Sequence, residues 1–106
     1  MSYGVLKKAA VDVVDDFSSK DIKAAYFPSA GNMQKYSAKT KLESIELTAP
    51  VRSVMPPRVN KVFSKLYGKK WADVSAFETV KPKTIGDFIK LCAEHAGEKL
   101  PDGEPT

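Results

Sequence analysis

Cys92 and His95 are the residues of this 106-residue chain whose types and spacing come nearest to chemistry. They lie three positions apart in a segment with helical periodicity, so one helix face carries a thiol and an imidazole together. Zinc needs three or four protein ligands, and the chain has no second cysteine or histidine. A thiol–imidazole pair also needs an orienting third group. We therefore expect Cys92 in the core and His95 at a helix edge, with no metal and no cofactor.

The other catalytic motifs in the sequence are incomplete. Asp15 and Asp16 are adjacent, and adjacent side chains on a helix point apart, so the two carboxyls cannot share a proton. Gly68, Lys69 and Lys70 lack the upstream glycine and the following hydroxyl of a phosphate-binding loop. The sequence also has no nucleophile elbow containing a serine. We therefore expect a protein that is not an enzyme.

The uneven distribution of charge is the most informative feature of the sequence. The chain has 17 basic and 13 acidic residues, which gives a net charge of +4. Residues 35–70 hold nine of the cations and only two acids, Glu43 and Glu46, so this window carries +7 and the rest of the chain −3. A chain polarised in this way can present a cationic face to an acidic partner. The nine cations are Lys35, Lys39, Lys41, Arg52, Arg58, Lys61, Lys65, Lys69 and Lys70.

Four segments have the features of helices that would position these side chains. Apolar residues recur at helical spacing in the three longer segments, and a Ser-x-x-Asp signal introduces the short one. Ser2 and Thr84 are suited to begin helices as N-caps, and Gly68 and Gly97 are suited to end them. The predicted helices span residues 3–17, 20–27, 57–67 and 85–96.

Residues 43–54 are the ambiguous part of the chain. Apolar residues alternate with polar residues or proline over 45–51, which is typical of a half-buried strand. A single strand must pair, with residues 74–80 or with a second chain. The alternative is a short helix that Thr40 caps, with Glu43 three residues later.

We therefore expect an α+β fold that is predominantly α-helical. Three to four short helices surround one core, with a short strand or hairpin in the 43–54 region. Residues 1–97 form a single compact domain, and the polar tail 98–106 is expected to be disordered. The predicted core consists of Leu6, Ala10, Val13, Phe17, Ile45, Leu47, Val59, Val62, Phe63, Leu66, Trp71, Phe77, Ile85, Phe88, Ile89 and Cys92.

The sequence predicts a soluble protein that is not associated with a membrane. No apolar run approaches the roughly 20 residues that span a bilayer. Asp12, Asp15 and Asp16 interrupt what would be the apolar part of a secretory signal. One cysteine allows no internal disulfide, so an intracellular location, cytoplasmic by default, is expected.

The predicted helix 57–67 carries the most compact group of cations. At 100° per residue, Arg58, Lys61 and Lys65 fall within a sector of about 60° that borders the apolar stripe. Such a cationic ridge can lie along phosphates or along an acidic protein surface. The alternative is that these side chains are solvated and that their aliphatic stems cover the edge of the core.

The predicted partner-binding face extends beyond this ridge into the rest of the basic window. Tyr36 and Tyr67 lie among its cations and are candidates to stack on a partner. The alternative is that both rings pack in the core or at its edge. The predicted face consists of Lys35, Lys41, Arg58, Lys61, Lys65, Lys69 and Lys70.

We expect a small accessory or interaction protein that docks an acidic surface of a larger partner through this basic face. An exposed apolar patch beside the ridge would be the distinguishing feature of that function. The alternative is a nucleic-acid-binding domain that contacts phosphates through the same residues. The isoelectric point of about 9.2 permits nucleic acid without requiring it. The oligomeric state and the identity of the partner stay open.

Residues 83–89 resemble the lead-in to the last helix of acyl carrier proteins. That family needs an Asp-Ser-Leu at the start of a central helix, where the serine takes the prosthetic arm. The chain contains no Asp-Ser-Leu, so the resemblance implies no carrier function. We interpret the stretch as an ordinary capped helix.

Overall fold

Helices account for all the regular elements among residues 2–101, the part of the chain that this computed structural model describes. The one β-type pairing found in this part is an isolated bridge between Lys41 and Thr84. The α-helices are α1 (Tyr3–Phe17), α2 (Ile22–Tyr26), α3 (Ala49–Ser53), α4 (Pro56–Tyr67), α5 (Ala76–Thr79) and α6 (Ile85–Ala96), and the 3₁₀ helices are η1 (Leu42–Ile45) and η2 (Gly68–Lys70).

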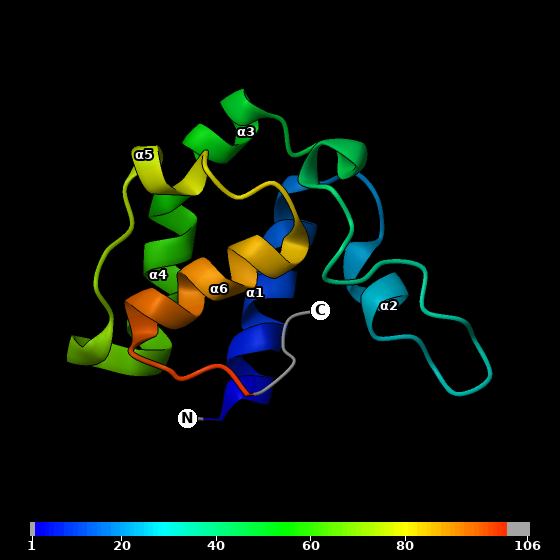
Figure 1. The fold of residues 1–106 in the computed structure, drawn as a ribbon, viewed down its shortest axis with the longest axis horizontal. Helices are drawn as coiled ribbons and strands as arrows, with labels where there is room; N and C mark the ends of the chain where they lie inside the picture. Colours follow the sequence, from blue (N-terminus) through cyan, green and yellow to red (C-terminus); the bar gives the residue numbers. More distant parts are fainter. Residues whose placement is uncertain (1, 102–106) are drawn as a thin grey trace.

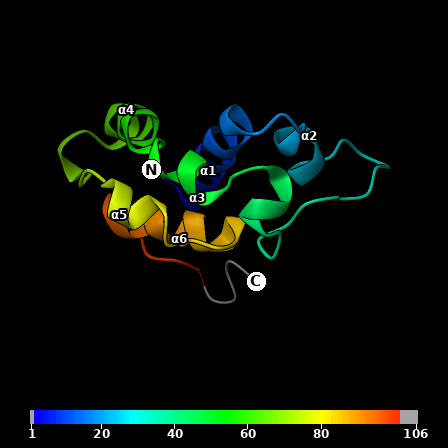
Figure 2. The same cartoon turned by 90° about the horizontal axis from the view of Figure 1, so that it is seen from above.

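The helices form two layers. Figure 2 shows α1 and α4 in one layer and α5 and α6 in the other. Helix α1 packs against α2, α4 and α6, and α3 packs against α5. In Figure 1, α6 crosses in front of α1, while α4 lies beside α1. The core therefore lies between the layers, and the outer side of the α1–α4 pair faces solvent.

Helix α1 has the predicted bounds and a wider buried surface than one stripe. Ser2 is its N-cap, and the Ser2 hydroxyl accepts a hydrogen bond from the Val5 N–H at 3.3 Å. Because α2, α4 and α6 all contact α1, its buried residues spread around more than half of the helix. They are Leu6, Ala9, Ala10, Val11, Val13 and Val14.

The acids near the end of α1 connect it to neighbouring elements. A carboxylate at a helix C-terminus is unfavourable for the helix dipole. The Asp15 carboxylate nevertheless accepts hydrogen bonds from the N–H groups of Ile22 (2.9 Å) and Lys23 (3.1 Å), at the start of α2. Asp12 forms an ion pair with Lys23 at 3.4 Å. Both carboxylates therefore fix α2 against α1, and Asp15 also satisfies two free donors of the first turn of α2.

The two other predicted long helices are present, and α6 has the predicted bounds. Helix α4 begins one residue earlier than predicted, and it ends at Gly68, whose N–H donates to the Ser64 carbonyl. Gly68 and Gly97 have positive φ angles of 61° and 69°, a region that glycine adopts without strain. Helix α6 begins with a capping box in which Thr84 and Asp87 each accept from the other's backbone N–H.

The strand predicted for residues 43–54 is wrong, and so is the α+β class. In the described part of the chain, this region forms η1 and α3, with Glu46 between them at a left-handed φ of 74°. Pro50 lies in the first turn of α3, where its missing N–H costs nothing, whereas it would interrupt a strand ladder. Residues 74–80, the suggested partner strand, include α5.

The alternative for this region, a helix that Thr40 caps, also differs from the structure. The first helical residue is Leu42, and the N-cap position is Lys41, which makes no side-chain capping bond. The apolar alternation has a different explanation. Ile45 and Leu47 both point into the core because the left-handed turn at Glu46 redirects the chain between them.

The predicted core is largely buried, with one clear exception. Phe77 is 83% exposed on the short helix α5, and Val74 and Thr79 fill the core beside it instead. Phe17, Val62 and Leu66 are half-buried at the edge of the core. The other predicted core residues are buried: Leu6, Ala10, Val13, Ile45, Leu47, Val59, Phe63, Trp71, Ile85, Phe88, Ile89 and Cys92.

The segment after α6 folds back toward the core. The Glu98 N–H donates to the Ala93 carbonyl at 2.9 Å, and the Leu100 side chain packs against the core. Residues 102–106, which complete the tail predicted to be disordered, lie outside the described residues. Among the described residues, no helix has the length and apolar character needed to cross a membrane.

Arg52 is buried, although the sequence analysis counts it among the cations of the basic window. Its side chain is 1% exposed and donates to the carbonyls of Leu47 (2.6 Å) and Val80 (3.2 Å), with the Glu43 carboxylate at 3.9 Å. The Thr79 hydroxyl donates to the Arg52 carbonyl at 2.6 Å. Arg52 therefore joins α3 to the end of α5, because one planar guanidinium reaches both carbonyls.

We expect Arg52→Ala to lower the free energy of unfolding by about 3–5 kcal/mol, because it opens a cavity and leaves two buried carbonyls without donors. Arg52→Lys keeps the charge but not the planar fork, so it should recover part of the loss. Urea denaturation followed by circular dichroism measures both. Lys39→Ala, at an exposed position, is the control and should change stability by less than about 0.5 kcal/mol. A loss at Arg52→Ala no larger than that of the control would contradict the joining role.

Candidate functional site

Helix α4 presents one apolar face to the core and an apolar edge to the surface. Val59 and Phe63 are buried, and the Phe63 ring stacks on Trp71 with centroids 4.8 Å apart. Val62 and Leu66 are half-buried on the side toward α1. The helix therefore keeps apolar side chains partly exposed to solvent in addition to those packed in the core.

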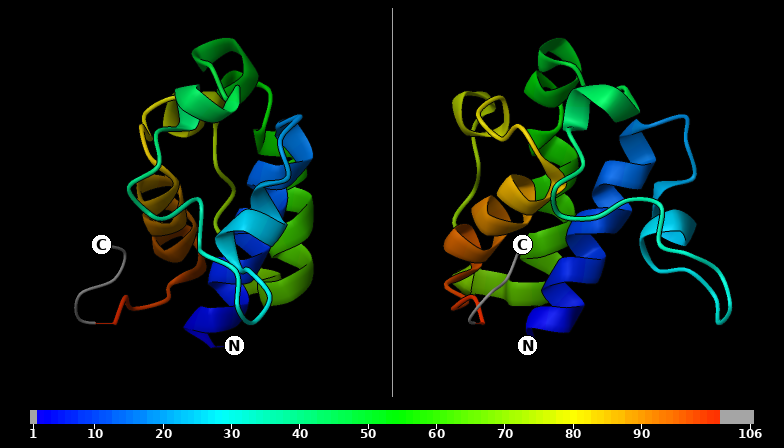
Figure 3. Two further views of the ribbon diagram at one scale, coloured as in Figure 1. Left: turned by 90° about the vertical axis from the view of Figure 1, so that its right-hand side faces the viewer. Right: turned by 45° about the vertical axis from the view of Figure 1, so that its right-hand side comes forward.

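These side chains form part of the floor of a groove between α1 and α4. The two helices lie side by side and run in opposite directions, with α6 on their inner side (Figure 3, left). The groove has a volume of about 480 Å³. Val5 is 41% exposed and lines it from α1, together with the small buried residues Ala9 and Val13. The floor is therefore mostly apolar and open to solvent.

The rim of the groove on the α4 side carries the three ridge cations predicted from the sequence. Arg58, Lys61 and Lys65 all line the groove and are all exposed. Lys8 lines it from the N-terminal half of α1. An apolar patch beside a cationic ridge is the feature expected of a protein-docking surface.

The two ends of the groove differ in charge. At one end the Arg58 guanidinium is paired with the Asp16 carboxylate, at an Nη2–Oδ2 distance of 3.0 Å. Lys8 and Lys65 lie toward the other end, because α1 and α4 are antiparallel. Lys61 lies between the two ends. Among the described residues, Lys8, Lys61 and Lys65 form no ion pair. The net positive charge therefore lies at the Lys8–Lys65 end.

The structure does not bring the other predicted cations to this groove. Residues 28–40 extend to one end of the long axis of the molecule, and η2 lies at the opposite end (Figure 1). Lys35 lines a separate hollow beside α2, and Lys70 lines one beside Gly97. Lys41 pairs with Thr84 at the start of α6. The seven predicted cations thus lie on different parts of the surface, with Arg58, Lys61 and Lys65 as the group that comes together.

Neither predicted contact tyrosine lines the groove. Tyr36 is half-buried, with the Lys35 ammonium 5.7 Å from its ring centroid. Tyr67 is half-buried and stacks on Phe63 with centroids 6.4 Å apart. Burial and the nearby Glu98 carboxylate raise the pKa of Tyr67 to about 12. Tyr67 is therefore part of the core edge.

Val5 and Lys8 are the groove residues that the sequence analysis misses. Val5 lies beside the apolar stripe that begins at Leu6. In the sequence it therefore looks like any apolar residue at the margin of an amphipathic helix. Only the packing of α1 against α4 places both residues in the same groove as Lys65. The available signal is the width of the apolar surface on α1, which exceeds what one neighbouring helix can cover.

His95 has an acid within hydrogen-bond distance, which the sequence does not reveal. Its Nε2 lies 2.6 Å from the Glu78 carboxylate, and its Nδ1 lies 2.5 Å from the Ala72 carbonyl. Both partners are acceptors, so both contacts are hydrogen bonds only when both ring nitrogens carry protons. Both ring nitrogens are therefore directed at acceptors within the protein. His95 thus fixes the segment between α4 and α5 against α6.

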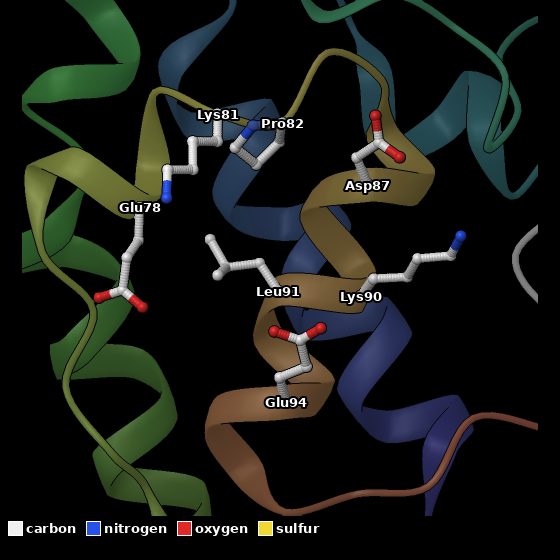
Figure 4. Close-up of a pocket in the computed structure, with 7 residues that line it drawn as sticks. All are labelled: Glu78, Lys81, Pro82, Asp87, Lys90, Leu91 and Glu94. Atoms are coloured by element: carbon white, nitrogen blue, oxygen red, sulfur yellow. The ribbon is translucent and has the colours of Figure 1, made fainter.

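A hollow of about 360 Å³ beside α6 contains mixed charges (Figure 4). Two of its three acids, Glu78 and Asp87, are engaged in local structure, and the third, Glu94, is exposed. Glu78 bonds to Ser75 and His95, and Asp87 accepts from the Thr84 N–H in the capping box. No group of three or more potential metal ligands occurs among the described residues.

Cys92 is buried in the core, as the sequence predicts. Burial raises the pKa of its thiol well above the ordinary value, so the thiol stays protonated and weakly nucleophilic. Cys92 and His95 therefore do not act as a pair, because His95 is engaged with Glu78 and Ala72.

Comparison with protein-family models, with curated proteins and with solved structures finds no match to this chain. The two-layer helical arrangement and the surface it presents are therefore the basis for assigning a function. Its most distinctive surface feature is the groove between α1 and α4, where an apolar floor lies beside a cationic rim.

The Glu78 contacts predict a pH-dependent contribution to stability. Hydrogen bonds from the Ser75 backbone, and then from His95, hold the pKa of Glu78 below its ordinary value of 4.5. A lowered pKa stabilises the fold above pH 4.5, and this contribution disappears as the pH falls through the folded-state pKa. Glu78→Gln should therefore cost about 1 kcal/mol at pH 7 and almost nothing in strong acid.

Urea denaturation of both proteins over a descending pH series measures this difference. Glu94→Gln, at an exposed position on the same side of α6, is the matched control and should show little difference at any pH. A cost of Glu78→Gln that stays constant from neutral pH to acid would contradict the assigned role of the carboxylate.

Proposed function

We propose that this protein is a non-enzymatic accessory protein that docks an acidic element of a larger partner protein in the groove between α1 and α4. The observation that carries the proposal is the combination of an apolar floor with unpaired cations on its rim. Each half of that combination would make a different contribution to binding.

The apolar floor is a surface whose burial by a partner would lower the free energy of the complex. Val5, Val62 and Leu66 keep apolar area in contact with water, although the core beneath them is closed. Removing apolar area from water contributes roughly 25 cal/mol per Å². The groove can therefore provide affinity for apolar side chains of a partner, and its concave shape suits a ridge of such side chains.

The rim supplies selectivity and a faster encounter. Lys8, Lys61 and Lys65 form no ion pair within the described chain, so carboxylates of a partner can approach them without displacing an internal acid. Complementary charges raise association rates and exclude partners of the wrong sign. An acidic and partly apolar protein element therefore matches both features of the groove.

Nucleic-acid binding through the same cations is the alternative. A phosphate backbone would use the rim but not the apolar floor. Lys35 and the η2 lysines Lys69 and Lys70 lie at opposite ends of the molecule, so they do not extend the rim into one continuous track (Figure 1). These two observations favour a protein partner.

Photo-crosslinking in extracts of the native cell tests the proposal. A benzophenone amino acid replaces Val5 in the groove or, as a control, Phe77, which is exposed far from it. The groove position should crosslink to a protein segment that is acidic and carries apolar residues, before and after nuclease treatment. The Lys61→Glu/Lys65→Glu double variant should reduce that crosslink at least tenfold, since each lysine becomes a repelling charge.

Lys69→Glu/Lys70→Glu changes the net charge by the same amount at η2, outside the groove, and should leave the crosslink within about twofold. Circular dichroism and urea denaturation check that both double variants stay folded. Loss of the crosslink after nuclease treatment, or an equal loss in the two double variants, would instead support nucleic-acid binding or a nonspecific effect of charge.

A further inference from the structure

We infer that the groove receives a single amphipathic α-helix whose acidic residues are gathered at the end that lies over Lys8 and Lys65. This inference rests on the proposed function and specifies the partner element of the same groove. Three observations support it: the shape of the groove, the chemistry of its walls and the difference in charge between its ends.

Both walls of the groove are helices, and their lining residues recur at helical spacing. On α1 these residues run from Val5 to Asp16, and on α4 they run from Arg58 to Leu66. The eleven steps from Val5 to Asp16 rise about 17 Å along the helix axis, so the α1 wall is as long as three helical turns. A third helix that lies along an antiparallel pair can pack its side chains between both rows.

The walls offer side chains but no backbone partners. Residues in the interior of α1 and α4 use their backbone groups in helical hydrogen bonds, and the described part of the chain contains no strand that an extended peptide could extend. An extended peptide over this apolar floor would leave its own N–H and C=O groups unpaired. A helix satisfies its own backbone and presents only its apolar stripe to the floor.

The charges define how the acids of the bound helix are arranged. At the Asp16 end, Arg58 is already neutralised, and a partner carboxylate there would meet the Asp16 carboxylate. Asp12 also lines the groove, although it is paired with Lys23 of α2. At the opposite end, Lys8 and Lys65 line the groove and form no ion pair among the described residues. Lys61 lies between the ends. Acids gathered at the Lys8–Lys65 end are therefore stabilised, and acids spread along the helix are partly repelled.

Selection from three pools of synthetic peptides tests the inference. The first two pools have the same composition, and all three have a helical apolar stripe that varies among Leu, Ile, Phe and Met. The first pool has its acids at one end, the second has them spread along the peptide, and the third is the first with a central proline that breaks the helix. Peptides are selected on the full chain and counter-selected on the Lys61→Glu/Lys65→Glu variant.

The first pool should yield binders whose chemical-shift changes map to the groove. Peptides from the second pool should bind about fivefold more weakly, and those from the third at least tenfold more weakly. Asp16→Asn should remove the difference between the first two pools, because it deletes the repelling carboxylate and frees Arg58. Asp73→Asn, at an exposed position outside the groove, is the control and should preserve that difference.

The outcomes separate this inference from the proposed function. If no pool yields peptides that contact the groove, the proposed function and the inference both fail. If all three pools bind equally in the groove, acidic docking stands, but the helical partner is overturned. If the first two pools bind equally and Asp16→Asn has no effect, a helix is still supported, whereas the arrangement of its acids is overturned.

Discussion

The packing of three helices around α1 is the constraint on which the rest of the structure depends. Helices α2, α4 and α6 each cover a different side of α1, and its small residues Ala9 and Ala10 let them approach closely. Helix α6 takes the inner side, so α4 must lie beside α1 and directs Phe63 toward Trp71. The outer side of the α1–α4 pair then has no covering helix among the described residues. The groove is thus a consequence of how the core closes.

Polar contacts keep the α4 wall of this groove in place. The Asn60 side chain of α4 accepts from the indole N–H of Trp71 at 3.0 Å and bonds both backbone groups of Val74, so it holds the irregular segment that follows η2. His95 holds the same segment from α6. Buried polar networks of this kind fix one arrangement when every member has a partner. A wall fixed before binding loses less entropy when a partner arrives.

Local patterns predict the long helices of this fold but not its tertiary contacts. The bounds of α1, α4 and α6 follow from caps and periodicity, and the clustering of Arg58, Lys61 and Lys65 follows from helix geometry alone. The strand prediction for residues 43–54 is wrong because alternation of apolar residues does not distinguish a strand from short helical turns joined by a left-handed residue. The burial of Arg52 depends on two carbonyls distant from its own segment, which no local pattern reveals.

Trp71 gives the chain a natural optical reporter of the junction between α4 and α6. It is the sole tryptophan, it is 7% exposed, and its ring lies 5.8 Å from that of His95 as well as against Phe63. An indole shielded from water emits at shorter wavelength than a solvated one. The emission wavelength of Trp71 therefore reports the opening of this junction. Events at the far end of the long axis, where residues 28–40 extend, would leave that emission unchanged (Figure 1).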